Sequence, residues 1–345
     1  MTPQFTNPLP IQLKFRSLGP ARILAAAAGA LLLFFAAAPP AAAQTPTLYV
    51  VRGMPMHAKL TENFLFQPPL TKADIGQIKI GGKPVPVTDF QPLLNGPHGL
   101  QLMVLFDSWQ MLGSGPGQFD DIKQFFHDMP PNVEIGVGWL LQGKVVVTQP
   151  FTTDRDLAGK ALVAKTREEA ANPKNDNGNP YSCLGYLAAH WPTPDPGKLR
   201  AVLMFSDGVI RNNALANSGD QVDPNILSAG EKMELAGIVS YPFFWQDPII
   251  ADPNRSSGSA VDAADNFSQM DALTGGTALV EGMFAPGSLG PLLNRLYSTL
   301  KSEAVLTLSD PDKPGKESRI DLKSTRDDIK LFGADQIVSG NKLGK

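Results

Sequence analysis

The fold is decided by residues 100–108, LQLMVLFDS, an almost uninterrupted apolar run that ends in Asp107 and Ser108. A strand with no polar alternation is typical of a parallel sheet, because helices cover both of its faces. The same kind of run recurs three times further along the chain, at residues 133–141, 199–205 and 238–244. The sequence therefore predicts several buried, parallel strands.

Between these runs lie segments whose apolar residues recur at the spacing of a helix. Residues 118–127 carry apolar side chains at Phe119, Ile122, Phe125 and Phe126, which recur at the period of a helix. Further helices are predicted over residues 154–166, 181–191, 224–236, 262–273 and 287–302. Strands that alternate with helices indicate βαβ units and a mostly parallel sheet.

The two flanks of this region have strand character. The Gly81-Gly82 turn between two alternating runs predicts a hairpin. Residues 304–308 and 318–322, separated by the turn-rich segment 310–315, predict a second, terminal hairpin. The expected organisation is a signal peptide over residues 1–43, an N-terminal β segment over 44–97, the α/β domain over 98–302, and a C-terminal β hairpin and tail over 303–345.

The first residues have the layout of a secretory signal. Lys14, Arg16 and Arg22 precede an apolar run over 23–38, and small residues follow up to Ala43. The run is shorter than the roughly 20 residues of a membrane span. We predict cleavage after Ala43, export to the periplasm or beyond, and no membrane span after cleavage. An uncleaved N-terminal anchor is the alternative.

Composition excludes several classes of function. A net charge of −3 offers no electrostatic basis for nucleic-acid binding. The single cysteine, Cys183, excludes an intramolecular disulfide, and its apolar surroundings predict an inert buried thiol. The chain has neither a Gly-x-Ser-x-Gly nucleophile elbow nor a phosphate-binding loop. We predict that the protein is not an enzyme.

Three segments resemble one family in the right order. Residues 102–108 resemble the first strand and acidic loop of von Willebrand factor type A domains, residues 202–208 resemble the fourth strand with its Asp-Gly, and residues 273–278 resemble a later Thr-Gly-Gly turn. The flanks resemble those of a bacterial, secreted subgroup. The resemblance implies a doubly wound sheet with helices on both faces. It also implies that ligands bind beyond the carboxyl ends of the strands.

The metal-binding motif of that family is incomplete in this chain. The family pattern is Asp-x-Ser-x-Ser, a distant Thr and the Asp of Asp-Gly, whose oxygens suit a divalent cation. Here Trp109 and Met111 stand where the two serines would be, so only Asp107, Asp207 and, with a shifted register, Ser182 remain as vestigial ligands. We expect no metal and no other cofactor, although weak binding of Mg²⁺ or Ca²⁺ stays open.

The predicted function is binding of another protein through the loops at the strand ends. The candidate contact residues are Asp107, Ser108, Trp109, Asp207 and Gly208. Trp109 either packs against a neighbouring loop or acts as an exposed aromatic anchor.

Two alternatives concern the same residues. One is a metal-dependent adhesion module in which Ser108 or Ser114 supplies a missing hydroxyl. The other is a hydrolase that uses Asp107 and Asp207 as acid and base. A purely structural role, in which the two aspartates buttress their loops, is also consistent with the sequence.

Carboxylates elsewhere are expected at helix starts. Asp154 is positioned as an N-cap, and Asp120 and Asp121 are expected to open the helix over 118–127.

Overall fold

The structure is a computed structural model. It describes residues 47–55, 69–107, 116–163, 179–193, 195, 197–208, 224–245, 258–280, 286–310 and 312–341. Residues 44–345 form one compact unit. The predicted signal peptide and its cleavage site lie outside the described residues.

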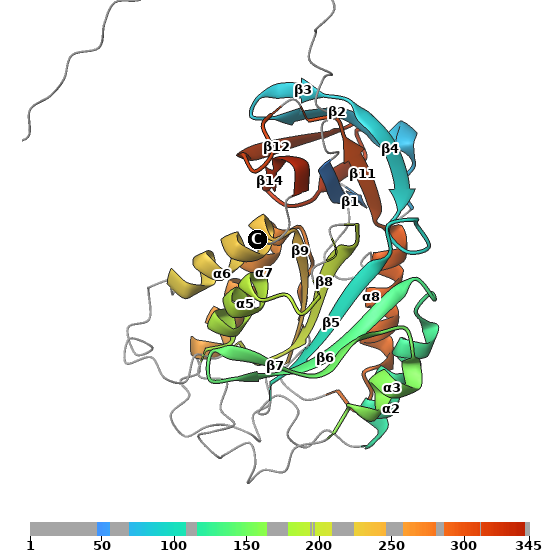
Figure 1. The fold of residues 1–345 in the computed structure, drawn as a ribbon, viewed down its shortest axis with the longest axis vertical. Coiled ribbons are helices and arrows are strands. Elements are labelled where there is room, and N and C mark those ends of the chain that lie inside the picture. Colours follow the sequence, from blue (N-terminus) through green and yellow to red (C-terminus); the bar gives the residue numbers. More distant parts are fainter. Residues whose placement is uncertain are drawn as a thin grey trace, which may run out of the picture. The chain divides into compact units, whose positions relative to one another are not determined.

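A six-stranded sheet is the centre of the structure, in the order β10-β9-β8-β5-β6-β7 (Figure 1). Its strands are β5 (Leu100–Phe106), β6 (Val133–Leu141), β7 (Lys144–Thr152), β8 (Leu199–Phe205), β9 (Ile238–Phe244) and β10 (Leu279–Val280). All pair in parallel except β7, which pairs antiparallel with β6. The chain runs from β5 out to β6 and β7, and then returns to β8 on the other side of β5. This order confirms the prediction of a doubly wound, mostly parallel sheet.

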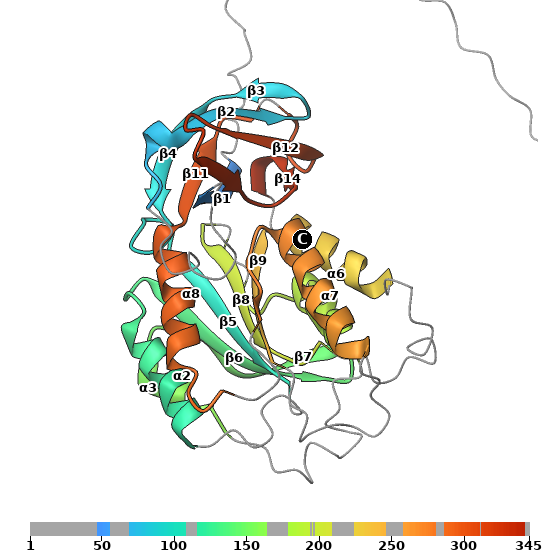
Figure 2. The same ribbon diagram turned by 180° about the vertical axis from the view of Figure 1, so that it is seen from behind.

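Helices cover both faces of this sheet (Figures 1 and 2). One layer holds α2 (Pro116–Asp128), α3 (Arg155–Lys160) and α8 (Gly290–Ser302), and the other holds α5 (Pro180–Ala189), α6 (Pro224–Leu235) and α7 (Gly258–Thr274). Leu102 and Val104 of β5 pack in the first layer's core, and Met103 and Leu105 pack in the second. This double burial explains the apolar run. Among the described helices, none is long and apolar enough to cross a membrane.

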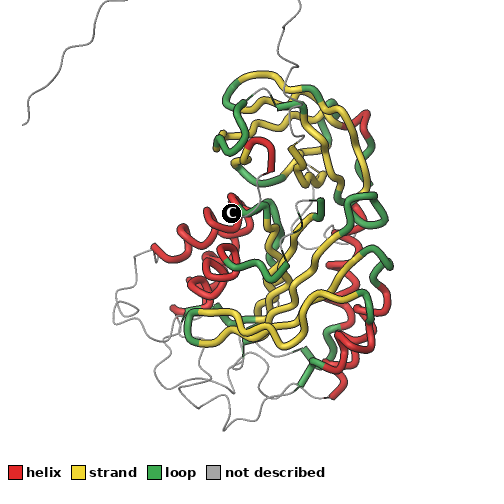
Figure 3. The backbone as a smooth tube through the Cα atoms, viewed as in Figure 1, coloured by secondary structure: helices red, strands yellow, loops and turns green. Residues whose placement is uncertain are grey.

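The remaining strands form two four-stranded sheets around a core of their own (Figure 3). One sheet has the order β13-β1-β11-β4 and the other β14-β12-β2-β3. Their strands are β1 (Thr47–Pro55), β2 (Ile75–Ile80), β3 (Lys83–Val85), β4 (Val87–Pro92), β11 (Ala304–Leu308), β12 (Glu317–Ser324), β13 (Ile329–Phe332) and β14 (Gln336–Val338). Short 3₁₀ turns lie at Lys72–Asp74 and Ser339–Asn341. We call this part the β-sandwich.

The prediction of a C-terminal hairpin is wrong. Strand β11 pairs with β1 and β4, and β12 pairs with β2 and β14, so β11 and β12 are not partners. Both edges of β11 are occupied by strands from the start of the chain, which leaves no edge for β12. The segments 44–97 and 303–345 therefore form one structure rather than two separate flanks. The N-terminal hairpin is confirmed, because β2 and β3 pair across Gly81 and Gly82.

The prediction of a helix cap at Asp154 is confirmed, and the prediction for the carboxylates of α2 is wrong. Asp154 accepts a hydrogen bond from the Leu157 amide at 3.0 Å and is the N-cap of α3, as predicted. Asp120 and Asp121 do not open their own helix, because α2 begins earlier, at Pro116, and has no acidic residue in its first turn. Asp121 Oδ2 instead accepts hydrogen bonds from the amides of Leu289 and Gly290, at 2.7 and 3.1 Å. Asp121 therefore caps α8 from a neighbouring helix.

Candidate binding surface at the carboxyl ends of the sheet

The two aspartates singled out by the sequence follow neighbouring strands. In the parallel pair β5–β8, Phe106 is the register partner of Phe205, so Asp107 and Ser206 leave the sheet next to each other. The Asp107 amide donates to the Phe205 carbonyl at 2.9 Å. The order of the sheet reverses between these two strands, and such a switch point is where open α/β sheets bind ligands.

A chain of hydrogen bonds fixes the start of the loop after β8. The Ser206 hydroxyl donates to Asp107 Oδ2 at 3.1 Å and accepts from the Gly208 amide, also at 3.1 Å. The Tyr181 hydroxyl, from α5, donates to the Gly208 carbonyl at 3.2 Å. Asp107 has no exposed surface, and Asp207 is 4% exposed. Asp107 is therefore part of the framework that holds the loop.

Gly208 has a backbone that other residues adopt only with strain. Its φ is +65°, in the left-handed region. A Cβ atom at this position would also lie 2.8 Å from the Phe267 ring of α7. The turn after Asp207 therefore depends on glycine both for its conformation and for its close packing.

Aromatic rings lie directly beneath this edge of the sheet. The rings of Phe106 and Phe205 stack with centroids 5.2 Å apart and an interplanar angle of 4°. Trp139 lies 5.4 Å from Phe106, and Phe243 lies 5.0 Å from Phe205, edge to face. This aromatic layer was not predicted, although the sequence carries a signal for it: four neighbouring strands have an aromatic residue at or near their carboxyl ends.

Cys183 of α5 is buried close enough to Asp107 for the carboxylate to affect its thiol. Burial, and then the Asp107 carboxylate, raise the pKa of the thiol to about 12. The thiol is buried and stays protonated at neutral pH, so its reactivity is low. The prediction that Cys183 is buried is confirmed.

Not every predicted site residue belongs to the described network. Ser108, Trp109 and Ser114 lie outside the described residues. Ser182 lies in the first turn of α5, where its amide donates to Asn179 Oδ1 at 3.1 Å. Its neighbour Tyr181 provides a hydrogen bond from α5 to the site, through the Gly208 carbonyl.

The described part of the site does not fit a divalent cation. It offers the carboxylates of Asp107 and Asp207, and the first of these is enclosed and already accepts a hydrogen bond from Ser206. Mg²⁺ requires near-octahedral oxygen coordination and keeps several waters. Across the described ranges, no group of three or more His, Cys, Asp or Glu side chains is arranged to hold a metal.

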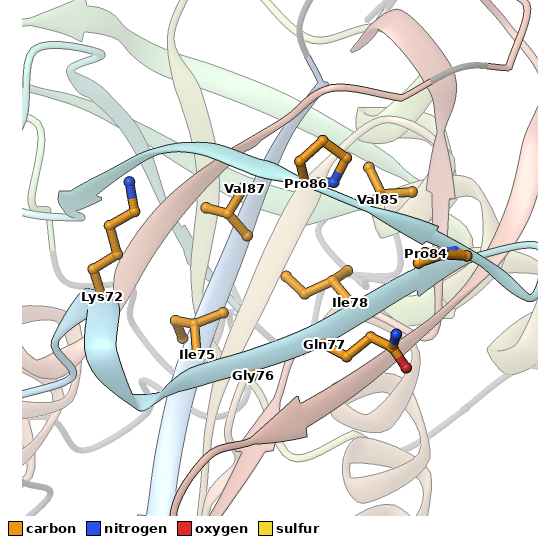
Figure 4. A pocket seen from close by; sticks show the side chains of 9 residues that line it. All are labelled: Lys72, Ile75, Gly76, Gln77, Ile78, Pro84, Val85, Pro86 and Val87. Carbon is orange, nitrogen blue, oxygen red and sulfur yellow. The ribbon is translucent and has the colours of Figure 1, made fainter.

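A concave surface lies on the β-sandwich. Strands β2 and β3 pair only as far as Ile78 and Val85, and the chain then diverges towards β4. The groove that opens there has a volume of about 360 Å³. Figure 4 shows Ile75 and Ile78 on one wall, Val87 on the other, and Lys72 at one end. Nothing in the described part of the chain indicates what would occupy this groove.

Comparison with known proteins gives only distant similarities. No protein-family profile matches the chain, and no curated protein matches its sequence. A crystal structure of the conserved hypothetical protein BatB from Bacteroides thetaiotaomicron is 13% identical, covers 59% of this chain and 98% of that one, and has a TM-score of 0.38. The SpRpn10 VWA domain is 13% identical, covers 56% of this chain and 94% of that one, with a TM-score of 0.37.

An aerotolerance-related membrane protein from Bacteroides fragilis is 14% identical and covers 59% of this chain and 98% of that one, with a TM-score of 0.35. The chain is thus similar to structures that include a von Willebrand factor type A domain. The doubly wound architecture itself is established by the strand order of this chain.

Proposed function

We propose that the chain is an exported, non-enzymatic module that binds another protein through the loops at the carboxyl ends of β5 and β8. The observation that carries this proposal is the network from Asp107 through Ser206 to Gly208 and Tyr181. It fixes the bases of both loops at the switch point of the sheet. Contact residues on loops that a rigid scaffold positions are typical of binding proteins.

The burial of the two aspartates favours binding over hydrolysis. A general acid or base must come within hydrogen-bonding distance of its substrate. Asp107 is enclosed, with Ser206 bound to its carboxylate, and Asp207 is almost fully buried. In this proposal the two residues support the surface, while Ser108 and Trp109 supply contacts, with Trp109 as the aromatic anchor.

Photo-crosslinking of the mature protein in its own envelope fraction would identify the partner, and the affinity of the purified pair can then be measured. Trp109→Ala should weaken binding by about 2 kcal/mol or more, as buried interface tryptophans do. Gln77→Ala, an exposed change on β2, is the matched control and should leave the affinity unchanged. Far-UV circular dichroism must show that both variants are folded. If folded Trp109→Ala binds as tightly as wild type, Trp109 is not an anchor of the contact surface.

A further inference from the structure

Four charged or phenolic side chains meet where the β-sandwich joins the doubly wound sheet. Arg52 comes from β1, Tyr241 from β9, Asp271 from α7, and Glu303 from the junction between α8 and β11. The Tyr241 hydroxyl donates a hydrogen bond to Glu303 Oε2 at 2.5 Å. We call these four residues the seam cluster.

The seam cluster is enclosed, and its charges do not balance. The exposed fractions are 8% for Arg52, 7% for Asp271 and 1% for Glu303. Arg52 Nε and Nη1, Asp271 Oδ1 and Glu303 Oε1 have no hydrogen-bond partner among the described residues. The guanidinium of Arg52 acts electrostatically on both carboxyls, and an uncompensated charge in a low-dielectric site is strongly unfavourable. A proton on one carboxyl removes the excess negative charge.

A third buried carboxyl lies along the same seam. Glu234 of α6 is 5% exposed, and its Oε1 accepts a hydrogen bond from the Gln336 amide of β14. It borders a cavity of about 60 Å³ between the two substructures. Lys198 also borders this cavity, but its ammonium group pairs with Glu134 at 2.5 Å.

We propose that this seam is a proton-binding latch. Neutral carboxyls at Glu303 and Glu234 hold the β-sandwich against the doubly wound sheet, and their deprotonation loosens β1 and β11. Glu303 is well placed for this role because it directly connects α8 to β11, and its hydrogen-bond partner Tyr241 belongs to the parallel sheet. The latch is separate from the loop surface of the proposed function.

The pKa values of the two carboxyls in the seam cluster are shifted in the direction that the latch requires. Burial raises the pKa of Glu303 to about 7, against the opposing effects of Arg52 and of the hydrogen bond from Tyr241. Burial also raises the pKa of Asp271, against Arg52 and the amide of Ala278. Both carboxyls are therefore more easily protonated than in water.

The pKa of Glu234 is raised as well. Burial raises its pKa to about 7, opposed by the Gln336 amide and reinforced by Asp335, Glu231 and Glu317. A carboxyl with a raised pKa in the closed state favours closure at low pH. That contribution is lost as the pH rises through the raised pKa.

Amide hydrogen exchange of the full chain tests the latch. For one carboxyl whose pKa is 4.5 when the seam is open and about 7 when it is closed, the opening equilibrium grows about tenfold between about pH 6 and about pH 8.5. After correction for the intrinsic pH dependence of exchange, protection of the β1 and β11 amides should fall by at least this factor.

Three variants separate the latch from a general loss of stability. Glu303→Gln keeps an acceptor for Tyr241 but cannot ionise, so the tenfold contribution should disappear. Tyr241→Phe removes a hydrogen bond that favours the ionised carboxylate, so the midpoint of the transition should move to higher pH. Asp321→Asn, an exposed change on β12, should leave the profile unchanged. A wild-type profile that is flat, or one that Glu303→Gln leaves intact, overturns the proposal.

Discussion

Ser206 joins Asp107 to the loop that follows β8, since its hydroxyl donates to the Asp107 carboxylate and accepts from the Gly208 amide. One side chain thus connects the ends of two neighbouring strands. Its loss would leave a buried carboxylate and a buried amide each short of one partner.

We therefore expect Ser206→Ala to lower the free energy of unfolding by about 1–3 kcal/mol, the cost of leaving buried polar groups unsatisfied. Urea denaturation followed by circular dichroism measures this change. Ser298→Ala is the matched control, because that exposed hydroxyl bonds only within its own helix, to the Asn294 carbonyl. Equal effects of the two substitutions would contradict the structural role of Ser206.

Gly208 and Gly315 allow the cost of close packing to be separated from the cost of backbone conformation. Both have positive φ, +65° and +85°, but a Cβ at Gly315 would meet nothing within 4 Å, whereas at Gly208 it would meet Phe267. Gly315→Ala should cost about 1–2 kcal/mol from conformation alone. Gly208→Ala should cost a further ~1–3 kcal/mol from overpacking. Thermal or urea unfolding that ranks the two variants equally would contradict the predicted contact.

The neighbouring carboxylates of α2 have different roles. Asp121→Ala removes the acceptor for the first amides of α8 and should cost about 1–2 kcal/mol, as the loss of other N-caps does. Asp120→Ala removes only an exposed pair with Lys123 and should cost no more than ~0.5 kcal/mol. Chemical denaturation of both variants provides the comparison, and a larger cost for Asp120→Ala would refute the assignment.

Divalent cations should leave the melting temperature almost unchanged. A functional site would stabilise the folded state by about 2.7 kcal/mol once the cation exceeds its Kd a hundredfold. Differential scanning fluorimetry with millimolar Mg²⁺, Mn²⁺ or Ca²⁺ tests this expectation. A rise of several degrees in wild type that disappears in Asp207→Ala would mean that the metal site is functional.

Stability should depend on pH in a definite direction. The contribution of the protonated Glu303 carboxyl is fully present below its unfolded pKa of 4.5 and is lost as the pH rises through about 7. For this single group the loss amounts to about 3 kcal/mol. Asp74 acts in the opposite sense, because hydrogen bonds from Thr71 lower its pKa, so its contribution is lost on acidification.

Urea denaturation at a series of pH values should therefore show a maximum on the mildly acidic side. Glu303→Gln should flatten the decline in stability between about pH 4.5 and about pH 7 and leave the part of the curve below this range unchanged. A decline of equal slope over this range in both proteins would contradict the assignment to Glu303.

The sequence predicted the α/β architecture because its signals are local. Runs such as Leu100–Phe106 are apolar throughout, since each strand is buried on both faces. The pairing of β11 with β1 could not be predicted in the same way. Alternating apolar residues show that a strand has one buried face, but they carry no information about which distant strand lies beside it.

In the candidate site too, features with a local sequence signal were predictable and contacts between distant segments were not. Asp107 and Asp207 were predictable because each follows a buried strand and lies in a motif with a known spacing. The role of Asp121 could not be predicted from the sequence. Its partners Leu289 and Gly290 are distant in sequence and are brought near only by the packing of α2 against α8. The seam cluster was missed for the same reason, since its four members come from separate elements.

The mixed origin of the β-sandwich has a consequence for synthesis on the ribosome. The Tyr49 hydroxyl donates to the Ala334 carbonyl, a contact between residues 285 positions apart. Strand β1 therefore emerges long before its partners β11 and β13. During this interval its hydrogen-bonding edges are available to other chains, a common origin of misassembly. The doubly wound domain can fold in the meantime, and by folding it would bring the end of β4 close to the start of β11. It would thus act as a template that shortens the search for the last strands.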